Sequence, residues 1–168
     1  SMIVLGMQTG HGRCTPLVWR AVTKSDLKGK RNEHEDELLS LFHECVSAIN
    51  RPIRVTVVAD RGFGNVALYN FIKETLNFEY IIRFRGDIQV ESEQFEQRQA
   101  RQWTGKNGRM RVLRSAYVTA KRAHVPVVVC VRSKGMKDTW CLASSRVDLT
   151  GAQIKTQYGK RFTIEESF

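Results

Sequence analysis

Asp60 is the residue of this sequence that is best placed to do chemistry. It follows the short apolar run Val55–Ala59, which is typical of a strand covered on both faces, and it precedes Gly62 and Gly64. A carboxylate in the turn between a strand and a helix lies where α/β folds place their sites. Two interpretations are open: Asp60 acts in catalysis, or it only hydrogen-bonds its own turn while Arg61 neutralises it.

A second candidate motif consists of Tyr158, Arg161 and Glu165. The segment 150–168 has helical propensity, and residues at positions i, i+3 and i+7 of a helix share one face. A phenol and a guanidinium suit phosphate oxygens, whereas a carboxylate suits a hard cation. Taken alone, the spacing favours a surface helix in which Arg161 and Glu165 form an ion pair.

Basic residues dominate the sequence, which has 168 residues and a formal net charge of +10. Residues 98–122 include eight basic side chains and no acidic one. Because a block of like charge repels itself, we expect a polyanionic partner, with nucleic acid as the first candidate and an ordinary solvated face as the alternative. The eight residues are Arg98, Arg101, Lys106, Arg109, Arg111, Arg114, Lys121 and Arg122.

Two tryptophans are candidates for contacts with nucleic-acid bases. Trp103 lies inside the basic block, and Trp140 lies in a later apolar segment. An aromatic ring can stack on an unpaired or flipped base. The alternative is packing in the core, which is favoured for Trp140 and equally open for Trp103.

The composition is that of a globular protein, with 42% hydrophobic and 26% charged residues. No apolar segment approaches the ~18 residues that a membrane-spanning helix needs, and no targeting signal is visible. The cysteines form no CxxC pair and have no histidine at ligand spacing, so zinc is disfavoured. We expect a cytoplasmic chain with reduced core thiols at Cys14, Cys45, Cys130 and Cys141.

The elements that must position these residues follow an alternating order. Asn32 is predicted to cap a helix whose apolar stripe contains Leu38, Phe42, Cys45, Val46 and Ile49, and Asn65 to cap a helix that reaches residue 76. Residues 106–108 (Lys-Asn-Gly) are predicted to form a hairpin turn. The expected strands are 2–7, 15–22, 55–59, 78–84, 110–119, 125–131 and 139–144, the first two paired as a hairpin.

Two motifs separated by a basic, β-rich segment closely resemble one group of enzymes. The motifs are Val57–Gly64 (Val-Val-Ala-Asp-Arg-Gly-Phe-Gly) and Tyr158–Glu165 (Tyr-Gly-Lys-Arg-Phe-Thr-Ile-Glu). They resemble bacterial insertion-sequence DDE transposases of the Tyr-Arg-Glu-Lys (YREK) signature group. The resemblance implies an α/β ribonuclease H-like mixed sheet flanked by helices, with a β-rich insertion before the last helix.

The resemblance also implies roles for individual residues. Asp60 and Glu165 would be catalytic acids that hold Mg²⁺ or Mn²⁺, because a pair of these ions can activate a nucleophile and stabilise a leaving oxygen in phosphoryl transfer. Tyr158 and Arg161 would contact the DNA end. The further DNA-binding candidates are Arg61, which could instead pair with Asp60 or a neighbouring acid, together with Trp103, Arg101, Lys106, Arg109, Arg111 and Arg114.

The implied protein is part of a cut-and-paste DNA transposase that cleaves transposon ends and joins them to target DNA. Residues 1–84 would form the core without its first strand, 85–138 the basic insertion, and 139–168 the return strand and catalytic helix. The first catalytic Asp of the family has no counterpart before Asp26, and the signature Lys has none after Glu165. We therefore expect a fragment truncated at both ends and inactive by itself.

Other interpretations stay open. The first is a non-catalytic DNA-binding or assembly module derived from a transposase. Another is a ribonuclease H-like nuclease that does not act in transposition. If the chain is part of a transposase or a module derived from one, its partner is double-stranded DNA, on which the protein would act as a homodimer. We expect it in the cytoplasm of a bacterium, associated with the nucleoid and with no membrane partner.

Overall fold

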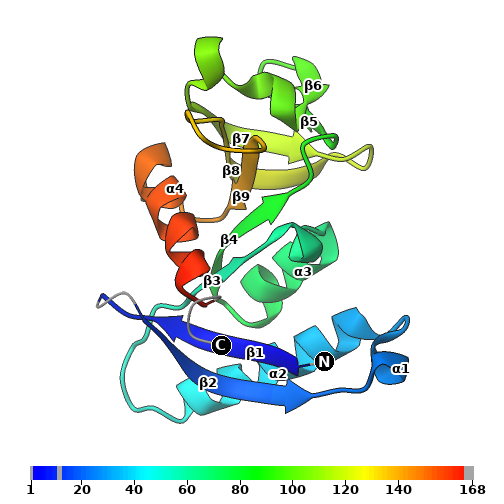
Figure 1. The fold of residues 1–168 in the computed structure, drawn as a ribbon, viewed down its shortest axis with the longest axis vertical. Coiled ribbons are helices and arrows are strands. Elements are labelled where there is room, and N and C mark those ends of the chain that lie inside the picture. The colour runs from blue at the N-terminus through cyan, green and yellow to red at the C-terminus, as the bar shows by residue number, and fades with distance from the viewer. Residues whose placement is uncertain (1, 11–12, 165–168) are drawn as a thin grey trace. The chain divides into compact units, whose positions relative to one another are not determined.

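The computed structural model describes residues 2–10 and 13–164 of the chain. The contacts divide it into two compact units (Figure 1). One unit contains residues up to 54 together with those from 160 onward, and the other contains residues 55–159. Each unit is described separately below. None of the helices in the described ranges has the length and apolar character that crossing a membrane requires.

The first unit is built on a β-hairpin and two helices. Strands β1 (Met2–Gln8) and β2 (Cys14–Ala21) pair antiparallel, which confirms the predicted hairpin. Helices α1 (Lys24–Leu27) and α2 (Arg31–Ser47) follow. The prediction that Asn32 caps α2 is wrong, because the helix begins one residue earlier and its cap, Lys30, makes no side-chain cap bond.

The predicted apolar stripe of α2 is only partly buried. Leu38 and Leu39 are buried beside Glu35, whereas Ile49 lies beyond the helix and is 48% exposed. Cys45 is exposed, so its assignment as a core thiol is wrong, although the other three cysteines are buried. A sheet of two strands offers a narrow surface, so it covers less of the helix than a large sheet would.

The second unit contains one mixed sheet of seven strands, and this confirms the predicted mixed α/β class. The strand order is β3-β4-β9-β8-β7-β5-β6, in which only the β3–β4 pair is parallel. The strands are β3 (Thr56–Ala59), β4 (Glu79–Phe84), β5 (Gln89–Glu91), β6 (Gln97–Gln99), β7 (Arg111–Val118), β8 (Ala123–Val131) and β9 (Trp140–Ser144).

Strands from residues 85–138 thus share a sheet with β3, β4 and β9. Strand β8 pairs with β9, and β9 pairs with β4, so the sheet is continuous through the whole unit. The assignment of 85–138 as an insertion into a core stays a prediction.

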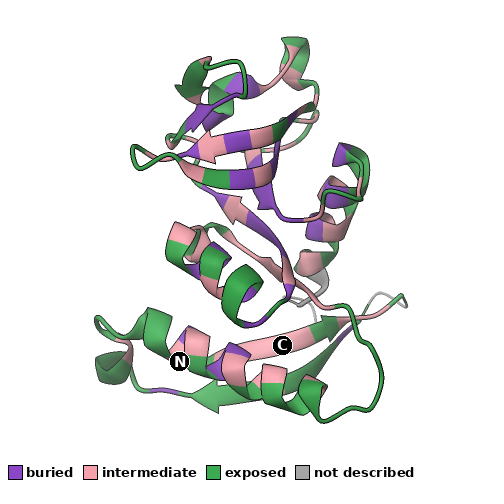
Figure 2. Ribbon diagram, turned by 180° about the vertical axis from the view of Figure 1, so that it is seen from behind, coloured by how far each residue is buried: buried purple, intermediate pink, exposed green. Residues whose placement is uncertain are grey.

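The core of this unit lies on the central strands. Ile81, Val127 and Leu142 are fully buried, and Ile154 and Tyr158 of helix α4 (Gly151–Gly159) pack against them. The buried residues follow β4, β8 and β9 in Figure 2. Apolar, largely β-branched strands of this kind suit a sheet that is covered by other elements.

Two helical predictions have different outcomes. Asn65 caps helix α3 (Val66–Asn70) as predicted, because its Oδ1 accepts the Leu68 N–H at 2.8 Å, and the helix continues as a π-helical turn over Phe71–Thr75. Of the segment 150–168 with its predicted helical propensity, Gly151–Gly159 is α-helical, Lys160–Ile164 forms a 3-10 helix, and residues 165–168 lie outside the described part of the chain.

The predicted hairpin turn at residues 106–108 is wrong. These residues form a short 3-10 turn before β7, while β7 pairs with β8 through a later turn. Gly108 has a φ of +75°, and a Cβ there would lie 2.1 Å from the carbonyl oxygen of Arg132. The glycine is therefore needed for close backbone packing rather than for a hairpin.

Candidate active site at the end of strand β3

Asp60 is the first residue after β3, and its side chain caps the next turn. Its Oδ1 accepts the Arg61 backbone N–H at 2.7 Å, and a 3-10 helix runs over Arg61–Phe63. Gly64 then packs against β4 so closely that a Cβ would lie 2.8 Å from the carbonyl oxygen of Arg83. The turn that carries Asp60 is therefore held against the neighbouring parallel strand.

Tyr158 of α4 reaches the same carboxylate. Its phenol donates a hydrogen bond to Asp60 Oδ1 at 3.1 Å, across 98 positions of sequence. The ring is fully buried and packs edge-on against Trp140, with 4.9 Å between ring centroids. Because packing fixes the ring, α4 sets the position of the phenol relative to Asp60.

Arg83 is a cation beside Asp60 that sequence reasoning missed. Ala59 pairs with Ile82 in the parallel β3–β4 ladder, so Asp60, just past the end of β3, lies beside Arg83, which β4 still holds opposite Leu142 of β9. Arg83 Nη1 lies 4.0 Å from Asp60 Oδ1, and its Nη2 lies 3.9 Å from Asp138 Oδ2. The missed signal was an arginine one position past the apolar part of the neighbouring strand.

Arg61 follows Asp60 directly, and the sequence left open an ion pair between their side chains. In the described part of the chain its guanidinium forms no ion pair with Asp60, and only its backbone N–H contacts that carboxylate. The side chain lines a cavity together with Arg83, Arg85 and Arg101. Its use as a phosphate contact stays a prediction.

The remaining residues of the second motif lie outside the unit that contains Asp60 or outside the described residues. Arg161 belongs to the other compact unit, where its guanidinium lies 4.8 Å from the ring centroid of Phe162. Glu165 lies outside the described residues. The expected sharing of one helix face by Tyr158 and Arg161 does not occur within α4, because α4 ends between them at Gly159.

Trp103 is a core residue in this fold. It is 1% exposed, and its Nε1–H donates to the carbonyl oxygen of Val90 at 3.1 Å. The guanidinium carbons of Arg98 and Arg111 lie 5.1 and 5.4 Å from the ring centroid. The ring is thus covered by its own chain, as the core-packing alternative expects, and a role in stacking on a base stays a prediction. Trp140 packs on Tyr158, as expected for a core residue.

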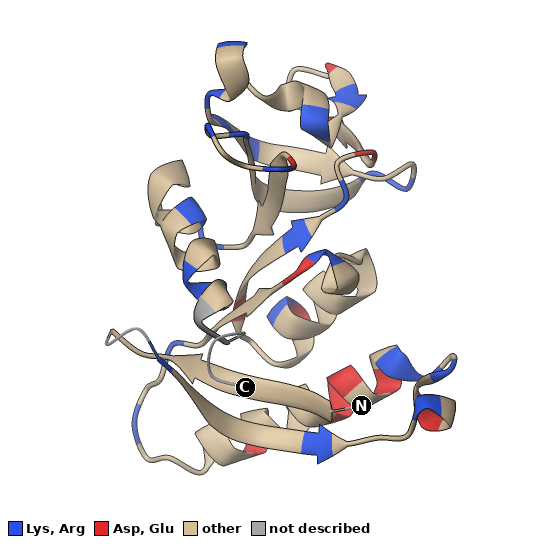
Figure 3. Cartoon of the chain, in the orientation of Figure 1, with Lys and Arg blue, Asp and Glu red and all other residues tan. Residues whose placement is uncertain are grey.

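The basic residues of the β-rich segment differ in how they are used. Arg114 donates to the carbonyl oxygens of Val147 and Leu149, at 3.1 and 2.9 Å. Arg101, Lys106 and Arg109 are exposed. Lysine and arginine are spread over the strands and loops beyond β4 in Figure 3, with few acidic residues among them.

A divalent metal site does not arise from the described residues alone. They contain no group of three or more histidine, cysteine or acidic side chains in metal-binding proximity. Asp60 offers a hard oxygen, but the guanidinium of Arg83 lies near it and Oδ1 already accepts two hydrogen bonds. A divalent ion held by Asp60 would need further acidic ligands from outside the described residues.

The sheet and the strand-end carboxylate define a mixed α/β protein with an acidic site at the edge of its parallel strand pair. The family model of the transposase DDE domain matches residues 22–168. The chain therefore belongs to the DDE transposase domain family. No curated protein and no solved structure matches it.

Proposed function

We propose that this chain is part of the catalytic domain of a cut-and-paste DNA transposase of the YREK signature group, with a ribonuclease H-like core. Membership of the DDE transposase family implies a transposase catalytic function. The finer assignment rests on the two motifs that contain Asp60 and Tyr158. The hydrogen bond between these residues is the observation that carries it, because it joins residues of separate motifs at one carboxylate.

In this proposal Asp60 is one carboxylate ligand of the divalent ions that the family uses. Such ions, when bound, activate the attacking oxygen and stabilise the leaving one. A further acidic ligand would come from outside the described residues, and Glu165 is the candidate on motif grounds. Tyr158 orients the Asp60 carboxylate through its hydrogen bond, and Arg83, whose Nη1 lies 4.0 Å from Oδ1, offsets part of its charge.

The test is DNA cleavage by the complete gene product on DNA that carries the matching transposon ends. Asp60→Asn keeps the size of the side chain but removes its charge, so cleavage should fall by ~100-fold or more, since metal stabilisation contributes several kcal/mol. DNA binding should change little. Asp36→Asn is the matched control, because Asp36 lies on α2, and it should retain full cleavage.

A second candidate is a non-catalytic DNA-binding or assembly module. The observation in its favour is that Asp60 already has protein partners: the Arg61 N–H, the Tyr158 phenol and the nearby Arg83. The same experiment separates the two. Cleavage by Asp60→Asn at the rate of the unaltered protein would remove the catalytic assignment and leave the binding module.

A further inference from the structure

We propose that a cationic cavity beside Asp60, here called the Arg83 pocket, binds a phosphodiester of the DNA backbone. This inference rests on the proposed function, because it names where the substrate of that site is held. The cavity has a volume of about 450 Å³, which is ample for a phosphate group and its sugar neighbours. Six basic side chains line it: Arg61, Arg83, Arg85, Arg101, Arg132 and Lys137.

The pocket adjoins Asp60 because of the strand register. Arg61 follows Asp60 directly, and Arg83 Nη1 lies 4.0 Å from the Asp60 carboxylate. Arg83 and Arg85 flank Phe84 at the end of β4, so the pocket opens where the parallel strand pair ends. A phosphate bound there would sit next to the candidate catalytic carboxylate.

The other basic side chains come from segments that backbone hydrogen bonds hold in place. The Arg101 N–H donates to the Gly86 carbonyl at 2.9 Å, and the Arg132 N–H donates to the Gly108 carbonyl at the same distance. Gly86 permits close approach, since a Cβ there would lie 3.1 Å from the Cβ of Arg101. The pocket is therefore assembled from separate stretches of chain, and backbone hydrogen bonds anchor those that carry Arg101 and Arg132.

The charge of the pocket is not balanced by its own acids. Two carboxylates line it: Asp138 lies 3.9 Å from Arg83, and Asp87 lies 3.8 Å from Arg85. Within the described ranges, the side chains of Arg61, Arg132 and Lys137 form no ion pair. Cations that converge without counter-charge repel one another, and a bound polyanion relieves this repulsion. Guanidinium groups also match phosphate oxygens in geometry.

Several basic residues of the β-rich segment are committed to contacts within the protein. Arg114 binds two backbone carbonyls, Arg122 pairs with Glu91 at 2.6 Å, and Arg98 and Arg111 lie over Trp103. These arginines stabilise the fold and have fewer donors left for DNA. The contrast places the phosphate contact in the Arg83 pocket rather than on the face of β7.

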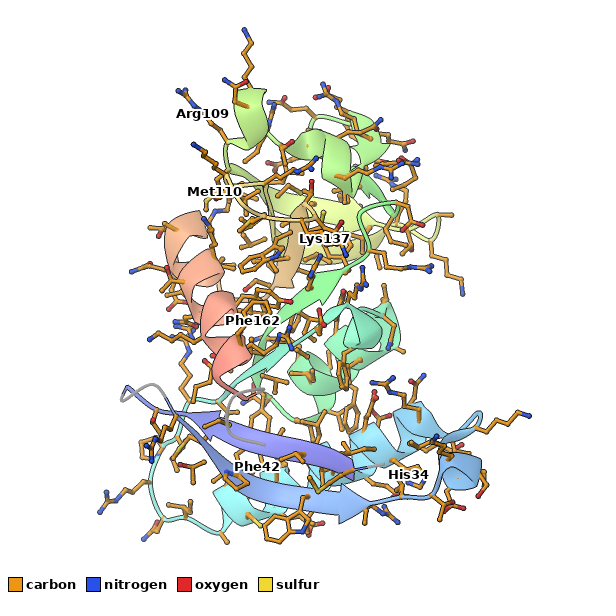
Figure 4. The ribbon with its side chains drawn as sticks, in the orientation of Figure 1. His34, Phe42, Arg109, Met110, Lys137 and Phe162 are labelled. Carbon is orange, nitrogen blue, oxygen red and sulfur yellow. The ribbon has the colours of Figure 1, made fainter. Side chains whose placement is uncertain are left out.

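Two double variants test this with equal loss of charge. Arg132→Gln with Lys137→Gln alters the pocket, whereas Arg51→Gln with Lys134→Gln alters exposed residues that do not line it. Figure 4 shows Lys137 beside the end of β4. Circular dichroism melting of both variants checks that each is folded.

The measurement is fluorescence anisotropy of a labelled DNA duplex, titrated with the whole chain at several salt concentrations. We expect the pocket variant to lose about tenfold more affinity than the control variant, and its salt slope to fall by ~0.9 for each phosphate contact removed. Inorganic phosphate and a mononucleotide serve as competitors, because they share the chemistry of the DNA backbone. Weak competition by both is the expected result.

The outcomes separate the pocket from the function on which it rests. Equal losses in the two variants would overturn the pocket but leave DNA binding and transposition intact. Tight binding of the mononucleotide, with duplex binding unchanged in the pocket variant, would also overturn it and point to a free nucleotide. Failure of the unaltered chain to bind duplex would overturn the pocket as a DNA site, whereas the transposase assignment is decided independently by the cleavage assay.

Discussion

The Tyr158 phenol donates a hydrogen bond to Asp60 Oδ1 at 3.1 Å, and this contact links helix α4 to the end of strand β3. The phenol belongs to a fully buried ring, whereas the Asp60 side chain is 38% exposed. One carboxylate therefore faces both the core and the solvent. Substitutions can distinguish the contribution of the hydrogen bond from that of the ring.

Tyr158→Phe should reduce the free energy of unfolding by about 1 kcal/mol, since it removes one hydrogen bond and keeps the ring. Tyr158→Ala should cost about 3–5 kcal/mol, because it also leaves a cavity beside Trp140. Urea unfolding measures both values. Tyr117→Phe is the control and should stay within about 0.5 kcal/mol of the unaltered chain. Equal stability of Tyr158→Phe and the unaltered chain would show that the hydrogen bond contributes nothing.

Gly64→Ala should destabilise the turn that carries Asp60 by about 1–3 kcal/mol. The new Cβ would lie 2.8 Å from the carbonyl oxygen of Arg83 and 2.9 Å from the Cα of Phe84, and backbone atoms cannot move aside cheaply. Gly10→Ala is the matched control, because nothing lies within 4 Å of its added Cβ. Thermal melting compares the two, and equal melting temperatures would contradict the close packing of Gly64.

Glu35 should make the stability of the chain depend on pH. Burial raises the pKa of its carboxyl above the usual 4.5, although Arg31 Nε lies 2.6 Å away and acts in the opposite direction. The folded chain then holds this proton more tightly than the unfolded chain does. The free energy of unfolding should fall as pH rises from 4.5 through the folded pKa, and the loss should persist above it.

Glu35→Gln tests that sign, because a neutral side chain has no such titration. Its stability should fall less than that of the unaltered chain between about pH 4 and about pH 7, as measured by urea unfolding. Glu33→Gln, at an exposed position of the same helix, controls for loss of charge. A steeper fall in Glu35→Gln than in the unaltered chain would mean that the ion pair with Arg31 outweighs burial.

Thiol reactivity should single out Cys45. It is exposed, whereas Cys14, Cys130 and Cys141 are buried. Burial raises the pKa of the Cys14 thiol, and the pKa of Cys130 is raised by its contact with Cys141 and by burial. Because the thiolate is the reactive form, iodoacetamide should label one thiol quickly in the folded chain, as read by mass spectrometry. Rapid labelling that survives in Cys45→Ser would contradict the burial of the others.

Local signals account for what the sequence predicted correctly. The cap at Asn65 depends on residues within one helical turn. The apolar composition of the runs at β4, β8 and β9 is enough to predict strands there. Asp60 was found for the same reason, since its strand and glycine turn are adjacent in the chain. These features need no knowledge of which strands pair.

Features that depend on which strands pair could not be predicted from the sequence. Arg83 becomes a neighbour of Asp60 only through the β3–β4 register, and Trp103 is covered only because β5 brings the Val90 carbonyl to its indole. The length of α4 was overestimated because helical propensity does not reveal the change to a 3-10 helix after Gly159. The exposure of Cys45 reflects how little of α2 a two-stranded sheet covers.

The pairing of β4 with β9 has a consequence for how the chain reaches its native state. Ile81 lies opposite Ser144, so the ladder can form only after the intervening strands have emerged from the ribosome and the long loop has closed. Contacts this distant in sequence slow folding, to the range of about milliseconds to seconds in small β-rich domains. Until β9 arrives, one edge of β4 stays open to pairing with other chains, which makes this strand a point at which newly made protein can aggregate.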